Sequence, residues 1–201
     1  MNHWRELLLA AVSPLEHGVG NLDVSGYRPP GDDAFRPGRT AAVLVPLLDM
    51  EQPEIVLTRR ADHLAQHPGQ VSFPGGAAEE NDSSAVQTAL REAYEEIGLQ
   101  SESVRPIGFL DRMDTISDYR VLPVVALVTP PVNWVLDERE VAEVFTVPLS
   151  VVMDIDLYSS EVFRRHGREY TIYTLEWQGQ RIWGATAAML MNLVTRMQKH
   201  T

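Results

Sequence analysis

The sequence predicts an α/β fold, in which helices pack on a buried β-sheet. An amphipathic helix is indicated from about Ser84 to Ile97, where apolar residues recur with the helical period. Apolar runs of strand length precede it at 40–48 and 54–59, and a second helical pattern follows at 190–197. The chain has 201 residues, of which 44% are hydrophobic, and this suits one domain with a sizeable core.

The N-terminal part is predicted to be a helix followed by a loop arm. Apolar residues at helical spacing indicate a short amphipathic helix: Trp4, Leu7, Leu8 and Ala11. Pro14 helps to end this helix because proline breaks the helical hydrogen-bond pattern. Residues 13–38 are rich in Gly and Pro without a clear period, so we expect an arm that either folds over a substrate or packs on the domain. The predicted division is an arm at 1–38 and a domain at 39–201.

Two strands are predicted ahead of the central helix. The apolar run Thr40–Leu48 has strand length, and Pro46 indicates a bulge or an edge position because proline cannot donate to a sheet ladder. Glu54–Arg59 alternates in part and predicts a second strand. Arg59 and Arg60 at its end face either solvent or a substrate.

The central helix has sequence signals at both ends. Ser84, with Gln87 three residues later, has the pattern of a capping box. Gly98 is the residue type that ends helices in the left-handed conformation. At about 100° per residue, one stripe of side chains is expected to pack on the rest of the domain: Val86, Leu90, Ala93 and Ile97.

Three carboxylates of this helix fall together on the side away from the stripe: Glu92, Glu95 and Glu96. Like charges at helical spacing repel, and a bound divalent cation would offset that repulsion. The alternative is a solvated acidic face. Two neighbouring features favour the cation: a Gly-Gly turn at 75–76, and Arg91, whose guanidinium can orient a carboxylate by a bidentate contact.

Strands and helices are also predicted after the central helix. Strands at 104–113 and 119–129 are joined by a polar hairpin loop, and Pro123 indicates a bulge. A strand at 141–147 is followed by a short helix that begins at Pro148. Strands at 170–177 and 180–183 flank a turn at Gln178 and Gly179. The closing helix is indicated by apolar residues at helical spacing: Leu190, Leu193, Val194 and Met197.

The central helix and the turn before it resemble the Nudix box. That pattern is Gly, five residues, Glu, seven residues, Arg-Glu, an aliphatic residue, any residue, Glu-Glu, any residue, Gly and an aliphatic residue. Its second half is matched by Arg91, Glu92, Ala93, Glu95, Glu96, Gly98 and Leu99. The first half departs from the pattern, because five residues after Gly76 the chain has Asp82, and eight residues separate it from Arg91. This shifted spacing resembles the coenzyme A pyrophosphatase branch of the family.

A second motif, upstream, is similar to the signature of the same branch. The matching residues are Val56, Leu57, Thr58, Arg60, Ala61, Gly69, Phe73, Pro74, Gly75 and Gly76. One position fails, because the second Arg of the signature is Ala65 in this chain. The missing guanidinium is the sort of group that holds a phosphate, so its loss bears on the identity of the substrate.

The resemblance implies a Nudix-type α/β/α sandwich, with a mixed β-sheet between helices, and a metal-dependent hydrolase. The reaction would cleave the pyrophosphate bond of coenzyme A or an acyl derivative. The products would be 4′-phosphopantetheine, or its acylated form, and adenosine 3′,5′-bisphosphate. Mg²⁺ or Mn²⁺ would bridge the two phosphates, stabilise charge on the leaving phosphate and lower the pKa of the attacking water.

The resemblance also implies roles for individual residues. Glu92 and Glu96 would bind the metal, Glu95 would add a ligand, the Gly76 carbonyl would complete the shell, and Arg91 would hold the glutamates in place. The general base stays open among three carboxylates: Glu92, Glu95 and Glu140. The residues expected to contact substrate are Arg60, Gly69, Phe73, Gly75 and Gly76. Two alternatives stay open here, since Phe73 is either a packing surface for substrate or part of the core, and Glu140 and Glu143 are either functional or solvated.

Composition limits the partners and the compartment. The formal net charge of −11 argues against a nonspecific nucleic-acid binder, which needs a basic face. The chain has no cysteine, so a disulfide framework and a thiol nucleophile are excluded. No apolar run has the length of a secretory signal or a membrane span, so we expect a soluble cytoplasmic protein without a membrane partner. The expected partner is a small-molecule diphosphate, and a homodimer is one candidate for the oligomeric state.

Two other functions are compatible with these motifs. The nearer one is a pyrophosphatase of the same scaffold that acts on ADP-ribose or a dinucleotide such as NADH, which the loss of arginine at Ala65 favours. The farther one is a non-catalytic nucleotide-binding module. The complete set of carboxylates argues against the module, because a protein without catalysis has no need to keep side chains that repel one another.

Overall fold

The structure is a computed structural model that describes residues 3–18, 39–115, 119–165 and 168–201. In these residues the large mixed sheet has eight strands: β1 (Arg39–Leu48), β2 (Glu54–Arg60), β3 (Val71–Ser72), β4 (Gly75–Ala77), β5 (Val104–Phe109), β6 (Met113–Asp114), β7 (Tyr119–Val128) and β8 (Val141–Pro148). A smaller antiparallel sheet contains β9 (Tyr158–Arg165), β10 (Arg168–Trp177) and β11 (Gln180–Trp183). The helices are α1 (His3–Ala11), α2 (Ala85–Ile97), α3 (Leu149–Val152) and α4 (Gly184–Gln198), with 3₁₀ turns η1 (Leu15–Gly18), η2 (Ser101–Ser103) and η3 (Ile155–Leu157).

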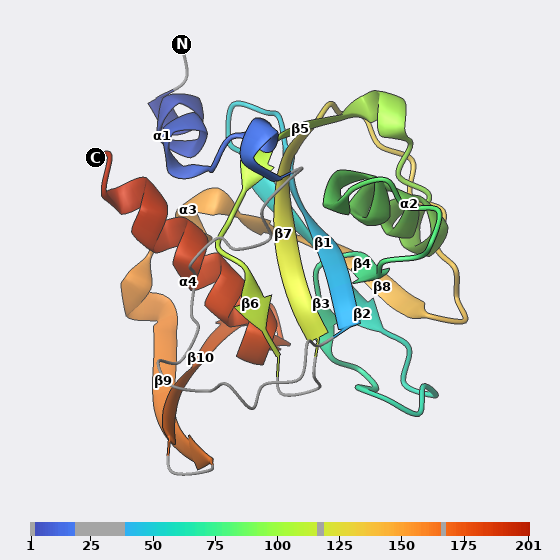
Figure 1. Ribbon diagram of the computed structural model, residues 1–201. Coiled ribbons are helices and arrows are strands. Elements are labelled where there is room, and N and C mark those ends of the chain that lie inside the picture. Colours follow the sequence, from blue (N-terminus) through green and yellow to red (C-terminus); the bar gives the residue numbers. More distant parts are fainter. Residues whose placement is uncertain (1–2, 19–38, 116–118, 166–167) are drawn as a thin grey trace.

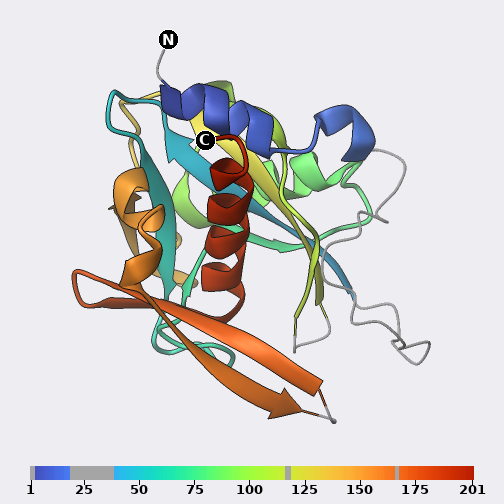
Figure 2. The ribbon, with the colours of Figure 1, turned by 90° about the vertical axis from the view of Figure 1, so that its left-hand side faces the viewer.

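The large sheet lies between two helical layers, so the predicted α/β sandwich with a mixed sheet is confirmed. Helix α2 covers one face, and α1 and α4 cover the other (Figures 1 and 2). Successive residues of β1 point to opposite faces of the sheet, so alternate residues pack against the two helical layers. Ala42 and Leu44 pack with Ala89 and Ala93 of α2, whereas Val45 belongs to the core cluster that includes the buried face of α4.

Strand β1 is the centre of the sheet, and the expectation that Pro46 marks an edge or a bulge is wrong. β1 runs parallel to β7 in continuous register, with Pro46 opposite Ala126. On its other side β1 pairs with β4 as far as Val43 and with β2 from Leu47 onward. Pro46 therefore lies in the gap between two partners, where its missing N–H is tolerated.

Helix α2 begins and ends where its sequence signals indicate. Ser84 Oγ accepts a hydrogen bond from Gln87 N at 3.2 Å, and Gly98 closes the helix with φ of 68°. The capping box is only half formed, because Gln87 Oε1 accepts from Ser83 N at 2.8 Å and not from the N-cap residue. The N-terminus of the helix is thus held by two consecutive serines.

The N-terminal residues pack on the domain. Helix α1 lies against α4, and Arg196 of α4 donates to Ala11 O and, at 3.0 Å, to Ser13 Oγ. Ser13 also pairs with Phe109 at the end of β5. The predicted helix over 4–11 is confirmed, and residues 13–18 follow the packing alternative. The remainder of the predicted arm, 19–38, lies outside the described residues.

The later elements match the prediction except at three places. The first difference is that the strand expected over 104–113 is divided into β5 and β6. The second is that the bulge lies on β5 between Pro106 and Gly108 instead of at Pro123. Residues 116–118 of the expected hairpin loop lie outside the described residues. The third difference is β9, which the sequence analysis did not predict.

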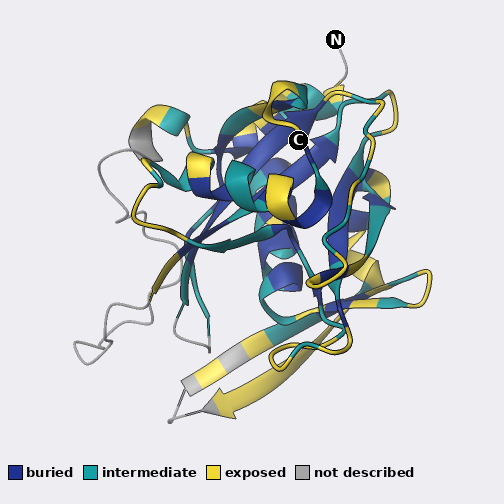
Figure 3. Ribbon diagram, turned by 90° about the vertical axis from the view of Figure 1, so that its right-hand side faces the viewer, coloured by how far each residue is buried: buried dark blue, intermediate teal, exposed yellow. Residues whose placement is uncertain are grey.

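The smaller sheet projects from the domain, and much of its described length is exposed (Figure 3). In β9, Val162 is 63% and Phe163 is 44% exposed. The turn between β10 and β11 is formed as predicted by Gln178 and Gly179, both with positive φ. The closing helix α4 is confirmed, with all four residues of its predicted stripe buried. In the described part of the chain, no helix is both long and apolar enough to cross a membrane.

Candidate active site

The site is built where β4 lies beside α2. Gly76 of β4 pairs with Ala42 of β1, and its main chain lies next to the Glu92 side chain. A Cβ atom on Gly76 would lie 2.5 Å from Glu92 Cδ. Only glycine leaves room for the carboxylate in this position, and the Gly76 main chain therefore lies next to Glu92 as the Nudix resemblance implies.

Glu96 is buried, which the sequence analysis did not expect. The residue is 5% exposed, and one carboxylate oxygen accepts a hydrogen bond from Gly75 N at 3.2 Å. Burial raises the pKa of Glu96 from its ordinary 4.5 to about 8. The helical stripe was expected to be the only buried face, but the short strand β4 covers the adjacent flank of α2 and encloses this carboxylate as well.

Glu92 is partly buried beside Glu96, one helical turn away. Its side chain is 17% exposed, and burial raises its pKa. The charges of Glu92 and Glu140 both raise the pKa of Glu96, so three carboxylates act on one small region. Such a region favours either protonated carboxyl groups or a bound cation.

Arg91 holds this end of the helix together. It donates to Glu92 Oε1 at 2.9 Å and to Glu95 Oε2 at 3.2 Å, as the sequence analysis expected. Its bidentate partner, however, is Asp82, at 3.2 Å and 2.9 Å, and it also donates to Ala77 O at 3.1 Å. Arg91 thus links the loop after β4 to the carboxylates of α2.

Asp82 is the partner that the sequence analysis did not assign. Its side chain is 3% exposed, and the hydrogen bonds from Arg91 lower its pKa to about 2. The sequence contained a signal for it, since Asp82 stands where the family pattern places an acidic residue, with one extra residue before Arg91.

We expect Asp82→Asn to lower the free energy of unfolding by about 2 kcal/mol at pH 6, because charge-assisted hydrogen bonds of a buried group are lost. The contribution of a carboxylate with a depressed pKa is present above its ordinary 3.8 and is lost as the pH falls toward about 2. Urea unfolding of both proteins between pH 6 and pH 2 measures this. A stability difference that does not shrink over that interval would contradict the assignment.

Glu95 does not join the other two glutamates. Its side chain is 57% exposed and is paired with Arg91. Among the residues that the structure describes, no three His, Asp or Glu side chains lie together in an arrangement that could hold a metal ion. The expected set of three glutamates is therefore not brought together, whereas Glu92 and Glu96 are.

Arg60 enters the same region from the end of β2. Its guanidinium interacts electrostatically with Glu96, and its Nε is buried without a hydrogen-bond partner among the described residues. Arg59, in contrast, has hydrogen-bond partners, since it donates to Glu143 and Asp62. Of this Arg pair, Arg60 is the residue whose charge acts on Glu96.

Two other residues of the upstream signature, Gly69 and Gly75, have backbone positions that favour glycine. Gly69 has a positive φ of 65°, and Gly75 lies so close to β1 that a Cβ would be 2.5 Å from Ala42 O. Phe73 is 3% exposed and packs in the core cluster beneath α4, which agrees with the core alternative. Ala65, where the signature has Arg, is exposed.

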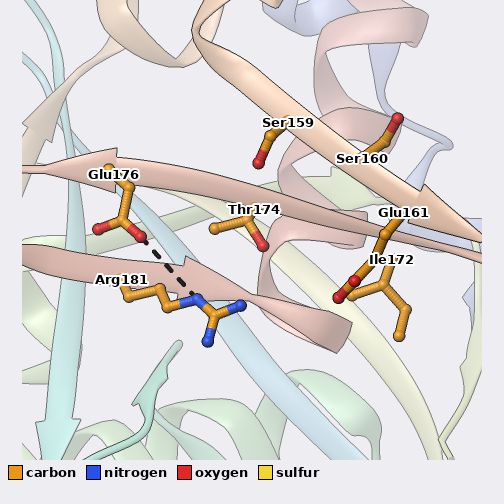
Figure 4. A pocket seen from close by; sticks show the side chains of 7 residues that line it. All are labelled: Ser159, Ser160, Glu161, Ile172, Thr174, Glu176 and Arg181. Carbon is orange, nitrogen blue, oxygen red and sulfur yellow. Dashed lines mark ion pairs between the residues drawn. The ribbon is translucent and has the colours of Figure 1, made fainter.

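A polar pocket of about 590 Å³ lies elsewhere, on the smaller sheet (Figure 4). Figure 4 shows Glu176 and Arg181 pointing toward each other at 3.9 Å on neighbouring strands. The pocket is lined by Ser159, Ser160, Glu161, Ile172, Thr174, Glu176 and Arg181. None of these residues belongs to α2, β2 or β4, so the pocket is separate from the glutamates.

The residues at Glu92 and Glu96 have the chemistry of a hard-cation site. Their donors are carboxylate oxygens beside the main chain of a glycine, and oxygen ligands are what Mg²⁺ and Mn²⁺ prefer. The burial that raises both carboxylate pKa values would be offset by a divalent ion. These two side chains therefore fit such an ion, with the rest of its shell to come from solvent, substrate or the main chain.

A comparison with models of known sequence families shows which family the chain belongs to. The sequence model described as NUDIX domain matches residues 38–174. The chain belongs to the Nudix family. A Nudix hydrolase of Enterobacter sp. (strain 638), NudL, described as uncharacterized, is 40% identical over 159 residues, or 79% of this chain and 83% of that protein. NudL of Yersinia pestis (strain Pestoides F), with the same description, is 39% identical over 79% of this chain and 80% of that protein.

Solved Nudix structures are more distant. The Nudix hydrolase RenU of M. smegmatis is 25% identical, with a TM-score of 0.49, and the match covers 60% of this chain and 76% of RenU. The Nudix domain of Shewanella oneidensis NrtR, solved with ADP-ribose, is 20% identical, with a TM-score of 0.45, and covers 65% of this chain and 83% of that chain. The segment of this chain that resembles the Nudix box runs from Gly76 of β4 through α2 to Leu99, and it contains Glu92 and Glu96.

Proposed function

We propose that this Nudix hydrolase cleaves the pyrophosphate bond of coenzyme A or of an acyl derivative. The observation that carries the proposal is the state of Arg60, whose Nε is buried without a hydrogen-bond partner among the described residues and whose charge acts on Glu96. Arg60 belongs to the upstream signature that resembles the coenzyme A branch, and Glu96 belongs to the Nudix box. The two motifs share Gly76, and we infer that Arg60 of the one and Glu96 of the other contribute to one site.

The proposed roles follow from burial and charge. Glu92 and Glu96 would hold Mg²⁺ or Mn²⁺, and Arg91 keeps Glu92 in place through a 2.9 Å hydrogen bond. A divalent ion held there would stabilise negative charge on the phosphates and lower the pKa of the attacking water. The buried Nε of Arg60 has no partner among the described residues, so this guanidinium is available to a phosphate oxygen.

The proton of the attacking water would pass to a nearby carboxylate. Glu140 is a candidate because its charge acts on both Glu92 and Glu96. Glu95 is a weaker candidate, since it is exposed and already paired with Arg91. Glu92 stays a third candidate, although its contact with Arg91 favours a role as a metal ligand.

One observation favours a second substrate class, ADP-ribose or a dinucleotide such as NADH. Ala65 stands where the resembling signature has Arg, so a cation that would contact a phosphate of coenzyme A is missing. The site chemistry at Glu92 and Glu96 would be the same for this substrate class. The two proposals therefore differ in substrate and not in the bond that is cleaved.

We expect the purified protein with Mg²⁺ or Mn²⁺ to convert coenzyme A into 4′-phosphopantetheine and adenosine 3′,5′-bisphosphate, which chromatography separates. ADP-ribose and NADH are assayed in parallel, and an EDTA-treated sample is the control for metal dependence. A higher kcat/KM for ADP-ribose or NADH would overturn the coenzyme A assignment in favour of the second class. No product from any of the three would favour a non-catalytic nucleotide-binding module.

A further inference from the structure

Three polar side chains from distant parts of the chain meet beside the candidate active site. Glu143 Oε2 on β8 accepts a hydrogen bond from Gln180 Nε2 on β11 at 2.9 Å. The same oxygen accepts from Arg59 Nε on β2 at 3.4 Å. Arg59 also donates to Asp62 Oδ1 at 3.0 Å. This network of Arg59, Glu143 and Gln180 fastens the smaller sheet to the ends of β2 and β8.

The pairing of β2 with β8 is irregular next to the network. Arg59 is opposite Glu143, but Arg60 is opposite Val141, so Ala142 is an extra residue on β8. A β-bulge bends its strand and re-aims the side chains that follow, and bulges often lie next to active sites. Here Val141 becomes the buried residue, at 2% exposure, and the carbonyl of Glu140 accepts a hydrogen bond from Ala61 N at 2.8 Å.

Arg60 and Glu140 lie on the far side of the bulge from Arg59 and Glu143. The charges of both residues act on Glu96, Arg60 from the end of β2 and Glu140 from the position just before β8. The last cross-strand pair before the bulge is Arg59 with Glu143. Gln180 holds Glu143 from a third direction, so the pair cannot shift along the strand without losing the 2.9 Å hydrogen bond.

We propose that Glu143 and Gln180 are positioning residues, which set the β2–β8 bulge and thereby hold Arg60 and Glu140 toward Glu92 and Glu96. The inference rests on the proposed hydrolase function for its effect on turnover. The Nudix box does not contain these residues. Gln180 comes from a hairpin whose other link to β8 is Trp177, which donates to Thr146 O at 3.1 Å.

Four variants test the proposal: Gln180→Ala, Glu143→Ala, Glu143→Gln and Glu176→Gln. Glu143→Gln keeps an oxygen that can accept from Gln180 or Arg59, so it is the rescue variant. Glu176→Gln is the matched control, since Glu176 lies on the same hairpin, its side chain is 64% exposed, and it pairs with Arg181 and not with β8.

The first measurement is amide hydrogen exchange, which needs no activity. We expect the Ala61 amide to exchange roughly tenfold faster or more in Gln180→Ala and Glu143→Ala, because its bond to Glu140 O depends on the bulge. The Val56 and Leu57 amides, in the regular part of the same strand pair, should keep their protection. Unchanged exchange at Ala61 in both alanine variants would overturn the proposal.

The second measurement separates positioning from general destabilisation. We expect kcat to fall about tenfold or more in the two alanine variants, while Mn²⁺ affinity stays within about threefold, because Glu92 and Glu96 lie on α2 and not on β8. Glu143→Gln should recover most of the kcat, and Glu176→Gln should match the wild type. Unchanged kcat in an active enzyme, or loss of Mn²⁺ affinity together with kcat, would overturn the positioning role. Wild-type protein without turnover would refute the proposed function, and the exchange result would still decide whether the network sets the bulge.

Discussion

Glu96→Gln is expected to abolish pyrophosphate hydrolysis and, at the same time, to stabilise the metal-free protein at alkaline pH. The folded-state pKa of Glu96 is raised to about 8 from its ordinary 4.5, so its charged form is disfavoured in the fold. The stability that the neutral carboxyl contributes is complete below about pH 4.5 and is lost as the pH rises through 8. Glutamine keeps the shape and stays neutral, so the variant avoids that loss.

The expected loss of wild-type stability is large. A pKa that rises by one corresponds to about 1.4 kcal/mol, so the loss between pH 5 and pH 9 is on the order of 4 kcal/mol. For a domain of this size, that lowers Tm by roughly 10 °C. Thermal unfolding in EDTA across this pH range measures the effect in the wild type, in Glu96→Gln and in Glu102→Gln, whose exposed carboxylate serves as the control.

Excess Mn²⁺ should reverse the effect in the wild type alone. A divalent ion that binds the folded state and requires the charged carboxylate raises Tm at pH 8. Glu96→Gln lacks the charge and should not respond. Turnover that survives in Glu96→Gln, or a wild-type Tm that does not fall with pH in EDTA, would show that this carboxylate does not have the assigned role.

The burial of Glu96 also shows where sequence reasoning about this site reaches its limit. The helical pattern was interpreted as placing Glu96 with Glu92 and Glu95 on the side away from the apolar stripe, and this is wrong for Glu96, which is 5% exposed. The stripe itself is confirmed by Ala93 and Ile97, which are fully buried. The helical repeat of apolar residues does not predict how far the buried surface extends around the helix. That depends on β4, a strand of three residues around Gly75 and Gly76, which has no apolar pattern of its own.

The same limit explains the other differences. Pro46 was expected at an edge because proline lacks a donor, yet the decisive fact is that β1 changes partner from β4 to β2 at that point. Strand β9 was missed because residues 159–164 are exposed on both faces, so no burial alternates along them. The Gln180 contact with Glu143 joins residues 37 positions apart and leaves no periodic signal. Motifs with fixed spacing were predictable, whereas contacts set by the crossing of strands were not.

Gly75→Ala should destabilise the fold, whereas Gly76→Ala should weaken metal binding, although the two residues are adjacent. A Cβ on Gly75 would lie 2.5 Å from both Ala42 O and Val43 Cα, and these are main-chain atoms of the central strand that cannot move independently. We expect Gly75→Ala to lower the free energy of unfolding by roughly 3 kcal/mol or more. A Cβ on Gly76 would meet the Glu92 carboxylate at 2.5–2.6 Å, and this is the end of a flexible side chain.

Gly76→Ala should therefore fold, with a free energy of unfolding within about 1 kcal/mol of the wild type, while its Glu92 carboxylate is pushed away from Glu96. Because a metal ligand that is moved by the length of a methyl group loses its geometry, Mn²⁺ affinity should fall about tenfold or more. Urea unfolding and calorimetric Mn²⁺ titration of the two variants measure both quantities. If Gly76→Ala binds Mn²⁺ as tightly as the wild type, Glu92 is not a ligand, and the divalent ion must be held by Glu96 with other groups.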